Sequence, residues 1–126
     1  MLSLVYFFNL FLLYLITPGS AVIQTKLANG SIESRKYDTR DRLIELTTKN
    51  VTDTVFCGFN YTLDAVGNRK KVEAYNGRTV DYTYYELNRL TEEKIADAAV
   101  GNRILGYGYD LVGNRSTKTD TAVPAV

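Results

Sequence analysis

The chain has 126 residues, with 15 basic and 14 acidic side chains, no histidine, no tryptophan and one cysteine, Cys57. A chain of this length forms one small domain or part of a larger one. The lack of histidine excludes a Ser-His-Asp triad, a Cys-His dyad and histidine-based metal centres. One cysteine excludes an intrachain disulfide framework and a multi-cysteine zinc site. A net charge of +1 provides no basic field for nucleic acid. We therefore expect no cofactor, no metal and no nucleic-acid partner.

Residues 1–21 form an uncharged leader, because the first charged side chain is Lys26. Residues 1–16 are almost entirely apolar, and we expect them to form an apolar helical segment. One interpretation is a secretory signal peptide, since Gly19 and Ala21 are spaced as in a small-residue cleavage site, although the basic n-region is missing. This interpretation predicts a secreted or cell-surface protein.

Two other interpretations of the leader remain open. A membrane anchor would give membrane contact through residues 1–16, but a helix of that length spans only about 24 Å of a hydrocarbon core of roughly 30 Å. The third interpretation is a strand-bearing or frame-shifted leftover at the edge of an incomplete reading frame.

Residues 22–120 contain two copies of a long repeat. Asn29-Gly30 and Asn76-Gly77 lie 47 residues apart, and FNYTLDAVGNR (59–69) and LGYGYDLVGNR (105–115) lie 46 apart. Each copy has two related halves, built on an aromatic residue, an acid, two variable residues, then Gly, Asn or Asp, and Arg. Self-similarity at a fixed spacing predicts a repeat architecture.

Turn residues and alternating apolar residues predict the local structure of each repeat. In Asp64–Gly67 and Asp110–Gly113, the aspartate can accept backbone hydrogen bonds and the glycine can adopt positive φ, as in a type I turn followed by a left-handed residue. Asn-Gly at 29 and 76 suits a two-residue type I′ hairpin turn. Between turns, apolar and polar residues alternate with period two, which is typical of half-buried antiparallel strands. We therefore expect an all-β meander of antiparallel hairpins.

Two segments depart from this pattern. Leu90–Val100 has a helix-forming composition but only a partial helical periodicity, so a short helix is an alternative to a strand there. Thr119–Val126 resembles a frayed tail, and we place the end of the repeat region at residue 120, with residues 121–126 as the tail.

An arginine follows each predicted turn, at Arg42, Arg69, Arg89 and Arg115. We expect each stem to lie along a tyrosine ring while the guanidinium reaches an acid or a carbonyl. The alternative is that arginine merely suits the exposed start of a strand.

These motifs together resemble the RHS/YD-repeat family over about residues 22–120. Some copies are degenerate, because Tyr85 replaces the aspartate, Asp41 and Asn88 replace the glycine, and Leu63 replaces the second aromatic residue. The repeat-signature residues are Tyr37, Asp38, Arg42, Tyr61, Asp64, Gly67, Asn68, Arg69, Asn76, Gly77, Tyr84, Arg89, Tyr107, Tyr109, Asp110, Gly113, Asn114 and Arg115.

The resemblance implies a β-rich strip that in long relatives winds into a hollow shell around a toxin or other cargo. It also implies exported or cell-surface proteins of bacteria, with teneurin-like relatives in animals, and partners that include further YD repeats of the same or another chain, a toxin cargo or a glycan. Long relatives often carry an Asp-Pro self-cleavage motif, which this sequence lacks, so protease and cargo functions are not carried over. We expect the chain to be a fragment or remnant of a longer array, a partial strip of such a shell.

Two other chemistries compete with this structural role. Glu86, Glu92, Glu93 and Asp97 form the densest carboxylate cluster, but a solvated charge run explains them better than a glycosidase pair. Exposed tyrosines, Tyr107 and Tyr109 above all, are candidate sugar contacts, although cross-strand packing also explains them. The sequence thus favours a non-enzymatic structural repeat segment, with a small carbohydrate-binding module as the alternative.

Overall fold

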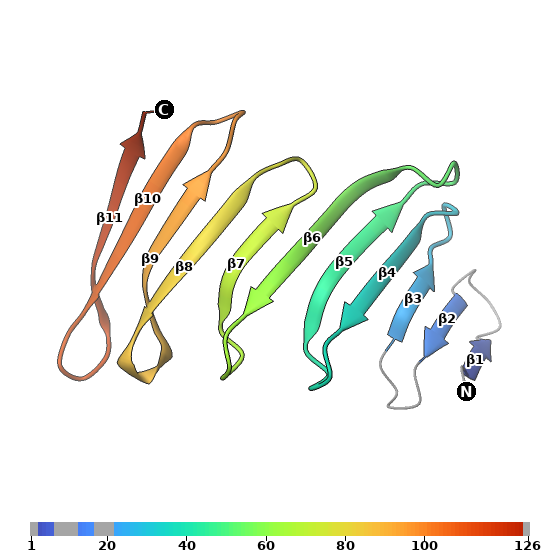
Figure 1. Cartoon of the computed structure of the whole chain (residues 1–126), viewed down its shortest axis with the longest axis horizontal. Coiled ribbons are helices and arrows are strands. Elements are labelled where there is room, and N and C mark those ends of the chain that lie inside the picture. Colours follow the sequence, from blue (N-terminus) through green and yellow to red (C-terminus); the bar gives the residue numbers. More distant parts are fainter. Residues whose placement is uncertain (1–2, 7–12, 17–21, 125–126) are drawn as a thin grey trace. The chain divides into compact units, whose positions relative to one another are not determined.

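The computed structural model describes residues 3–6, 13–16 and 22–124 of the chain. The chain divides into two compact units, Met1–Asn60 and Tyr61–Val126, and both consist of β-strands. Within each unit the strands follow one another in chain order, and each described pair of neighbours runs antiparallel (Figure 1). The predicted all-β meander of antiparallel hairpins is confirmed.

The first unit contains five strands and most of a sixth. Bulges interrupt the register at the ends of several hairpins, as between Lys36 and Tyr37 in the fourth strand. The strands are β1 (Ser3–Tyr6), β2 (Leu13–Ile16), β3 (Val22–Lys26), β4 (Ile32–Tyr37), β5 (Leu43–Lys49) and β6 (Val55–Leu63), whose last three residues belong to the second unit.

The second unit continues the same pattern. A short 3₁₀ turn replaces the regular hairpin turn in one place. The elements are β7 (Arg69–Ala74), β8 (Thr79–Tyr85), η1 (Glu86–Asn88), β9 (Arg89–Ala96), β10 (Asn102–Tyr109) and β11 (Arg115–Val123).

The described residues of the leader are strands, so the expected apolar helix is wrong there. β2 pairs with β1 on one side and with β3 on the other. Leucine, valine and tyrosine suit strands as well as helices, and pairing with neighbouring strands decides between the two. The cleavage-like residues Gly19 and Ala21 lie outside the described residues. No helix in the described part of the chain has the length and apolar character needed to cross a membrane.

One alternative and one expectation about the second unit are settled by strand pairing. Leu90–Ala96 lies in strand β9, so the helical alternative for this segment is wrong, because β8 and β10 pair with it on both sides and outweigh its helix-forming composition. The frayed tail expected from Thr119 onward is wrong as far as Val123, since β11 pairs with β10 up to the Val123–Asn102 pair.

One face of the second unit is mainly aromatic and aliphatic, and the other face is mainly charged. The register from β7 to β10 pairs Val72 with Val80, Val80 with Ile95, and Tyr82 with Glu93. Side chains alternate between faces along each strand, so the neighbours two positions away share these faces. The aromatic face carries Val72, Val80, Tyr82, Tyr84, Ile95, Leu105, Tyr107 and Tyr109, and the charged face carries Lys71, Glu73, Asp81, Glu92 and Lys94.

The sheet buries little of its apolar surface. Among the described residues, Val80 is the buried hydrophobic side chain, with 3% exposure. A sheet needs a second layer to remove an apolar face from water. The aromatic side chains of the second unit are therefore mostly half-buried by their cross-strand neighbours alone.

Candidate functional site at the turn edge

Six hairpin turns share one five-residue geometry. In each, the first residue donates its N–H to the carbonyl of the fifth, and the fourth donates its N–H to the carbonyl of the first, as in Asp64–Asn68 at 2.9 and 3.2 Å. The fourth residue has positive φ, which is the type I turn followed by a left-handed residue. The turns start at Leu27, Asp38, Asn50, Asp64, Ala74 and Asp110.

The type I′ turns predicted at the two Asn-Gly pairs are wrong. A type I′ turn needs positive φ at both central residues, but only Gly30 and Gly77 of these pairs have it, at 83° and 85°. The two asparagines instead keep negative φ, and their side-chain oxygens accept backbone N–H groups two residues further on. Ser31 donates to Asn29 at 3.0 Å, and Arg78 donates to Asn76 at 3.1 Å. These turns therefore belong to the same class as the Asp-x-x-Gly turns.

The predicted turn aspartates organise their own backbone. The Oδ1 atom of Asp64 accepts N–H bonds from Val66 at 3.0 Å and Asn68 at 2.8 Å, and Asp110 accepts from Val112 at 3.1 Å and Asn114 at 2.8 Å. Bonds to a carboxylate favour its charged form. The pKa of Asp110 is lowered chiefly by the Asn114 N–H. Burial raises the pKa of Asp64, but the hydrogen bonds from Asn68, Gly67 and Val66 together lower it below its ordinary value.

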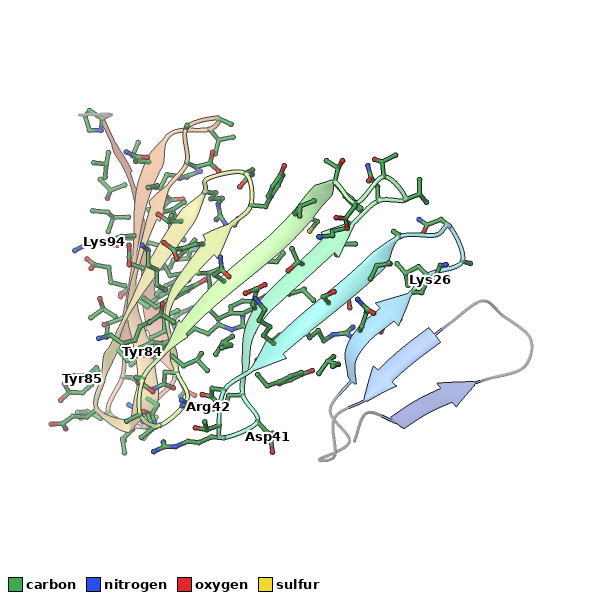
Figure 2. The ribbon with its side chains drawn as sticks, turned by 45° about the vertical axis from the view of Figure 1, so that its right-hand side comes forward. Lys26, Asp41, Arg42, Tyr84, Tyr85 and Lys94 are labelled. Carbon is green, nitrogen blue, oxygen red and sulfur yellow. The ribbon has the colours of Figure 1, made fainter. Side chains whose placement is uncertain are left out.

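Asp38 has an additional partner in its own turn. The Nη2 atom of Arg42 lies 2.7 Å from Asp38 Oδ2, and the N–H groups of Arg40 and Arg42 donate to Oδ1. The Arg42 side chain is the largest cause that lowers the pKa of Asp38 from 3.8 to about 2. Figure 2 shows Asp41 and Arg42 at the end of the β4–β5 hairpin.

The degenerate signature residues keep or locally change the turn. Asp41 stands where other copies have glycine and adopts φ 56°, so its turn retains the common geometry. Where Tyr85 replaces the aspartate, the chain forms η1 instead, and Leu87 and Asn88 both have positive φ, at 64° and 57°.

Two signature tyrosines join neighbouring hairpins through their hydroxyl groups. Tyr84 of β8 donates to the carbonyl of Arg69 at the start of β7, at 2.9 Å. Tyr109 of β10 donates to the carbonyl of Leu90 near the start of β9, at 2.7 Å. In both cases a tyrosine near the end of one strand donates to a main-chain carbonyl near the start of the preceding strand. Figure 2 labels Tyr84 beside its neighbour Tyr85, and alternation along β8 places their side chains on opposite faces.

Three of the four signature arginines lie over tyrosine rings. The Cζ atom of Arg69 is 4.9 Å from the ring centre of Tyr61. Arg115 has the same relation to Tyr107 one repeat later, at 5.8 Å, and Arg89 lies 5.8 Å from the ring centre of Tyr109. Guanidinium groups at these distances attract the ring electrostatically.

Side chains also link successive turns at one edge of the second unit. Alternate turns of a meander lie at the same end of its strands. The second unit therefore has three turns at one end, β6–β7, β8–β9 and β10–β11. Asn68 of the first donates to Oδ1 of Asn88 in the second at 2.9 Å. Arg89 at the end of the second lies against Gly113 in the third. We call these three turns and their links the turn edge.

The carboxylates predicted as a cluster are not brought together. Glu93 accepts the Tyr107 hydroxyl at 2.7 Å, whereas Glu92 pairs with Lys94 at 3.3 Å on the opposite face. Asp97 accepts N–H bonds in its own turn and lies 3.4 Å from Arg78. The described residues contain no group of three side chains suited to hold a metal ion.

The candidate sugar contacts Tyr107 and Tyr109 are engaged within the sheet. Both hydroxyls donate to protein oxygens, and each ring carries an arginine over one face. A sugar stacks on an open aromatic face. The sugar-binding role of these two residues stays a prediction from sequence, and their contacts favour cross-strand packing.

Sequence reasoning missed several residues with roles in these contacts. Asn50 opens a turn in which it accepts N–H bonds from Thr52 and Thr54, and its spacing to Asp53 matches the Asp-x-x-Gly pattern that could have identified it. Asn88 and Glu93 accept hydrogen bonds from residues far away in the sequence, Asn68 and Tyr107, and no local sequence pattern predicts these bonds.

The chain matches no family model and no curated protein sequence. It does resemble solved structures of a bacterial toxin complex. It superimposes on the TcdB2-TccC3 structure with a TM-score of 0.75 and 25% identity, over 90% of this chain and 6% of that chain. The TcdB2-TccC3 structure without its hypervariable C-terminal region gives the same values. The Tc holotoxin pore of Photorhabdus luminescens gives a TM-score of 0.77 and 24% identity, over 90% of this chain and 5% of that chain.

The chain thus spans about a twentieth of the solved chains that it matches. These likenesses support the resemblance to RHS-type repeats that the motifs indicate. The chain has the fold of a short segment of the TcdB2-TccC3 chains.

Proposed function

We propose that the chain is a non-enzymatic structural repeat segment that contributes antiparallel sheet to a larger shell or to another secreted or cell-surface assembly. Enclosing a cargo or adhering to a surface would be the work of that assembly, as the resemblance to RHS/YD-repeat proteins implies. Its partners in this role are further YD repeats of the same or another chain.

The observation that carries this proposal is the direction of the signature contacts. The hydroxyls of Tyr84 and Tyr109 reach the main chain of the preceding strand, and Asn68 and Arg89 reach the following turn. These groups join one hairpin to the next and do not converge on a pocket. Repeat proteins gain their stability from such contacts between neighbouring units.

The low burial of the chain also supports a role inside a larger sheet. Val80 is the buried hydrophobic side chain among the described residues, so these strands would gain stability from neighbours that extend or cover them. The likeness to parts of much longer toxin chains agrees with this role.

Inserting one more repeat tests the proposal. Arg69 and Arg115 occupy equivalent positions, so residues 69–114 inserted after Asn114 add 46 residues in register. The insertion should raise the urea midpoint and the m-value of unfolding, because each added unit forms a new interface and buries more surface. The control inserts residues 74–119 at the same place. This insert has equal length, but it breaks the alternation of strands and turns. Equal destabilisation by both insertions would contradict the proposal.

A further inference from the structure

Two asparagines in the sequence, Asn29 and Asn76, stand directly before glycine. An asparagine in this position can lose its side-chain amide without an enzyme, because the backbone nitrogen of the next residue can attack the side-chain carbonyl carbon. Glycine favours the attack, since it has no Cβ atom and adopts backbone conformations that other residues avoid. Asparagine is accordingly a heat-sensitive residue. The two Asn-Gly pairs share this reaction, and their surroundings decide how fast each one reacts.

The reaction consumes water and releases ammonia. At Asn76, the Gly77 nitrogen gives up its proton and forms a bond to Asn76 Cγ, and the side-chain nitrogen leaves as ammonia with that proton. The product is a cyclic imide between the two residues. Water then adds to one of the two imide carbonyls, and the bond from that carbon to the nitrogen breaks. The ring opens to an aspartyl residue or to an isoaspartyl residue, in which the main chain runs through the side-chain carbon.

The two Asn-Gly pairs occupy the same place in the same kind of turn. Gly30 donates its N–H to the carbonyl of Leu27 at 2.9 Å, and Gly77 donates to that of Ala74 at 3.0 Å. Both glycines have positive φ, at 83° and 85°. Before either nitrogen can attack, its N–H must leave the turn carbonyl and the glycine peptide must rotate toward the asparagine side chain. The two rates therefore differ by what else holds each pair in place.

The Asn29-Gly30 pair is held by Ser31 and by Val51. The Oδ1 atom of Asn29 accepts the N–H of Ser31 at 3.0 Å and also accepts the Ser31 hydroxyl. Ser31 is 4% exposed, so these hydrogen bonds are shielded from water. A Cβ atom on Gly30 would come within 2.6 Å of Val51 Cγ1, in the turn between β5 and β6. Rotation of the Gly30 peptide must therefore break these bonds and displace the valine.

The Asn76-Gly77 pair is held by fewer contacts in the described part of the chain. The Oδ1 atom of Asn76 accepts the Arg78 N–H at 3.1 Å, and the Arg78 side chain lies 3.4 Å from Asp97. A Cβ atom on Gly77 would have no neighbour within 4 Å among the described residues. We propose that Asn76-Gly77 is a site of spontaneous deamidation in the folded chain, and that the fold protects Asn29-Gly30 from the same reaction.

Deamidation at residue 76 changes the hairpin that contains the buried valine. The β7–β8 turn is closed by the Ala74 N–H, which donates to the Arg78 carbonyl at 2.8 Å. Close to this turn, Val80 pairs with Val72 and is 3% exposed. An isoaspartyl residue adds one carbon to the main chain, so the five-residue turn can no longer keep both of its backbone hydrogen bonds. The chain should therefore lose stability as it ages.

Peptide mass mapping of the full chain tests the proposal. The folded chain is aged at mildly alkaline pH in labelled water, because the attacking nitrogen must lose a proton. The mass increase at each Asn-Gly pair is followed over time. Asn76 should react roughly tenfold faster than Asn29, which corresponds to about 1.4 kcal/mol of activation free energy. In urea above the unfolding midpoint the two pairs should react at similar rates. A folded chain in which Asn29 reacts as fast as Asn76, or a rate ratio that unfolding leaves unchanged, would overturn the proposal.

Val51→Ala tests the protection of the first pair. It removes the contact that restrains Gly30, so the rate at Asn29 should rise several-fold. Asn76 in the same chain is the internal control, and its rate should stay as in the wild type. An unchanged rate at Asn29 would contradict protection by packing.

Two variants at residue 76 test the effect of deamidation on stability. Asn76→Gln needs a larger ring for the same attack, so it should show no mass increase at this site, and its urea midpoint should not fall with age. Asn76→Asp introduces the negative charge without the additional main-chain carbon, and it should keep the midpoint of fresh wild type. Aged wild type should have a lower midpoint than either variant. A midpoint that falls equally in wild type and Asn76→Gln would refute the weakened hairpin. The repeat-insertion experiment uses fresh protein, so the two proposals can fail separately.

Discussion

The guanidinium of Arg89 lies against Gly113, two strands away in the same unit. A Cβ atom on Gly113 would come within 2.5 Å of Arg89 Nη2 and 2.9 Å of Cζ. Gly113 also has φ 94°, so glycine serves both the turn and the close approach of the arginine. Gly67 occupies the equivalent position one repeat earlier, with φ 101°, and a Cβ there would have no neighbour within 4 Å.

Gly113→Ala should therefore destabilise the protein more than Gly67→Ala. Both alanines must adopt positive φ, which costs about 1–2 kcal/mol, and only the one at 113 also displaces Arg89. We expect an additional loss of about 1 kcal/mol, measured by urea unfolding. In an Arg89→Ala background the two substitutions should cost the same, and an undiminished difference there would refute the contact as its cause.

Removing the tyrosine hydroxyls should weaken the links between hairpins. Tyr109→Phe and Tyr84→Phe each leave a carbonyl without its hydroxyl donor, and each should lower the free energy of unfolding by about 1 kcal/mol. The more buried Tyr109 should show the larger effect. Tyr85→Phe, at a side chain with 61% exposure, is the control and should change stability little. Equal effects at all three positions would argue against the links.

Replacing Asp41 by glycine should stabilise the β4–β5 turn. Asp41 holds φ 56° at the position where Gly67 and Gly113 stand in other turns. Relief of the left-handed strain outweighs the larger chain entropy that glycine loses on folding, so we expect a gain of about 0.5–1 kcal/mol in thermal unfolding. The reverse change, Gly67→Asp, should destabilise by a similar amount, and a stabilising result there would contradict the argument.

Acid should remove a contribution that Asp38 makes to stability. The pKa of Asp38 in the folded chain, about 2, lies below its ordinary value of 3.8 because Arg42 stabilises the charged carboxylate. A lowered folded pKa gives stability that is present above about pH 4 and is lost as the pH falls toward 2. Urea midpoints measured from pH 5 to pH 2 should fall less steeply in Asp38→Asn than in the wild type.

Alkali should reveal the bond between Tyr107 and Glu93. The hydrogen bond to Glu93 is the largest cause that raises the pKa of Tyr107 from 10.0 to about 12. A raised folded pKa gives stability that is present below pH 10 and is lost as the pH rises toward 12. Glu93→Gln should move the pKa of Tyr107 down toward 10. The titration of Tyr107 is obtained by subtracting the tyrosinate absorbance of a Tyr107→Phe chain from that of the otherwise identical chain that keeps Tyr107. Glu92→Gln lies on the opposite face and should leave that titration unchanged.

The turns of this protein could be predicted from its sequence because they depend on hydrogen bonds between residues close together in the chain. Asp64 and Asp110 bond to N–H groups within four residues, so their spacing to glycine predicts the turn without knowledge of any other strand. The same reasoning failed at Asn76-Gly77, because the Asn76 side chain accepts the Arg78 N–H while its backbone keeps negative φ, whereas a type I′ turn needs positive φ at that position.

Tertiary structure alone decided which side chains meet. Tyr84 and Tyr109 donate to carbonyls 15 and 19 residues away, and the guanidinium of Arg89 lies over the ring of Tyr109. Those partners depend on the register between strands, which bulges shift by single residues and which no local motif encodes. Leu90–Ala96 illustrates the same physics, because hydrogen bonds to strands on both sides outweigh the helical preference of its residues.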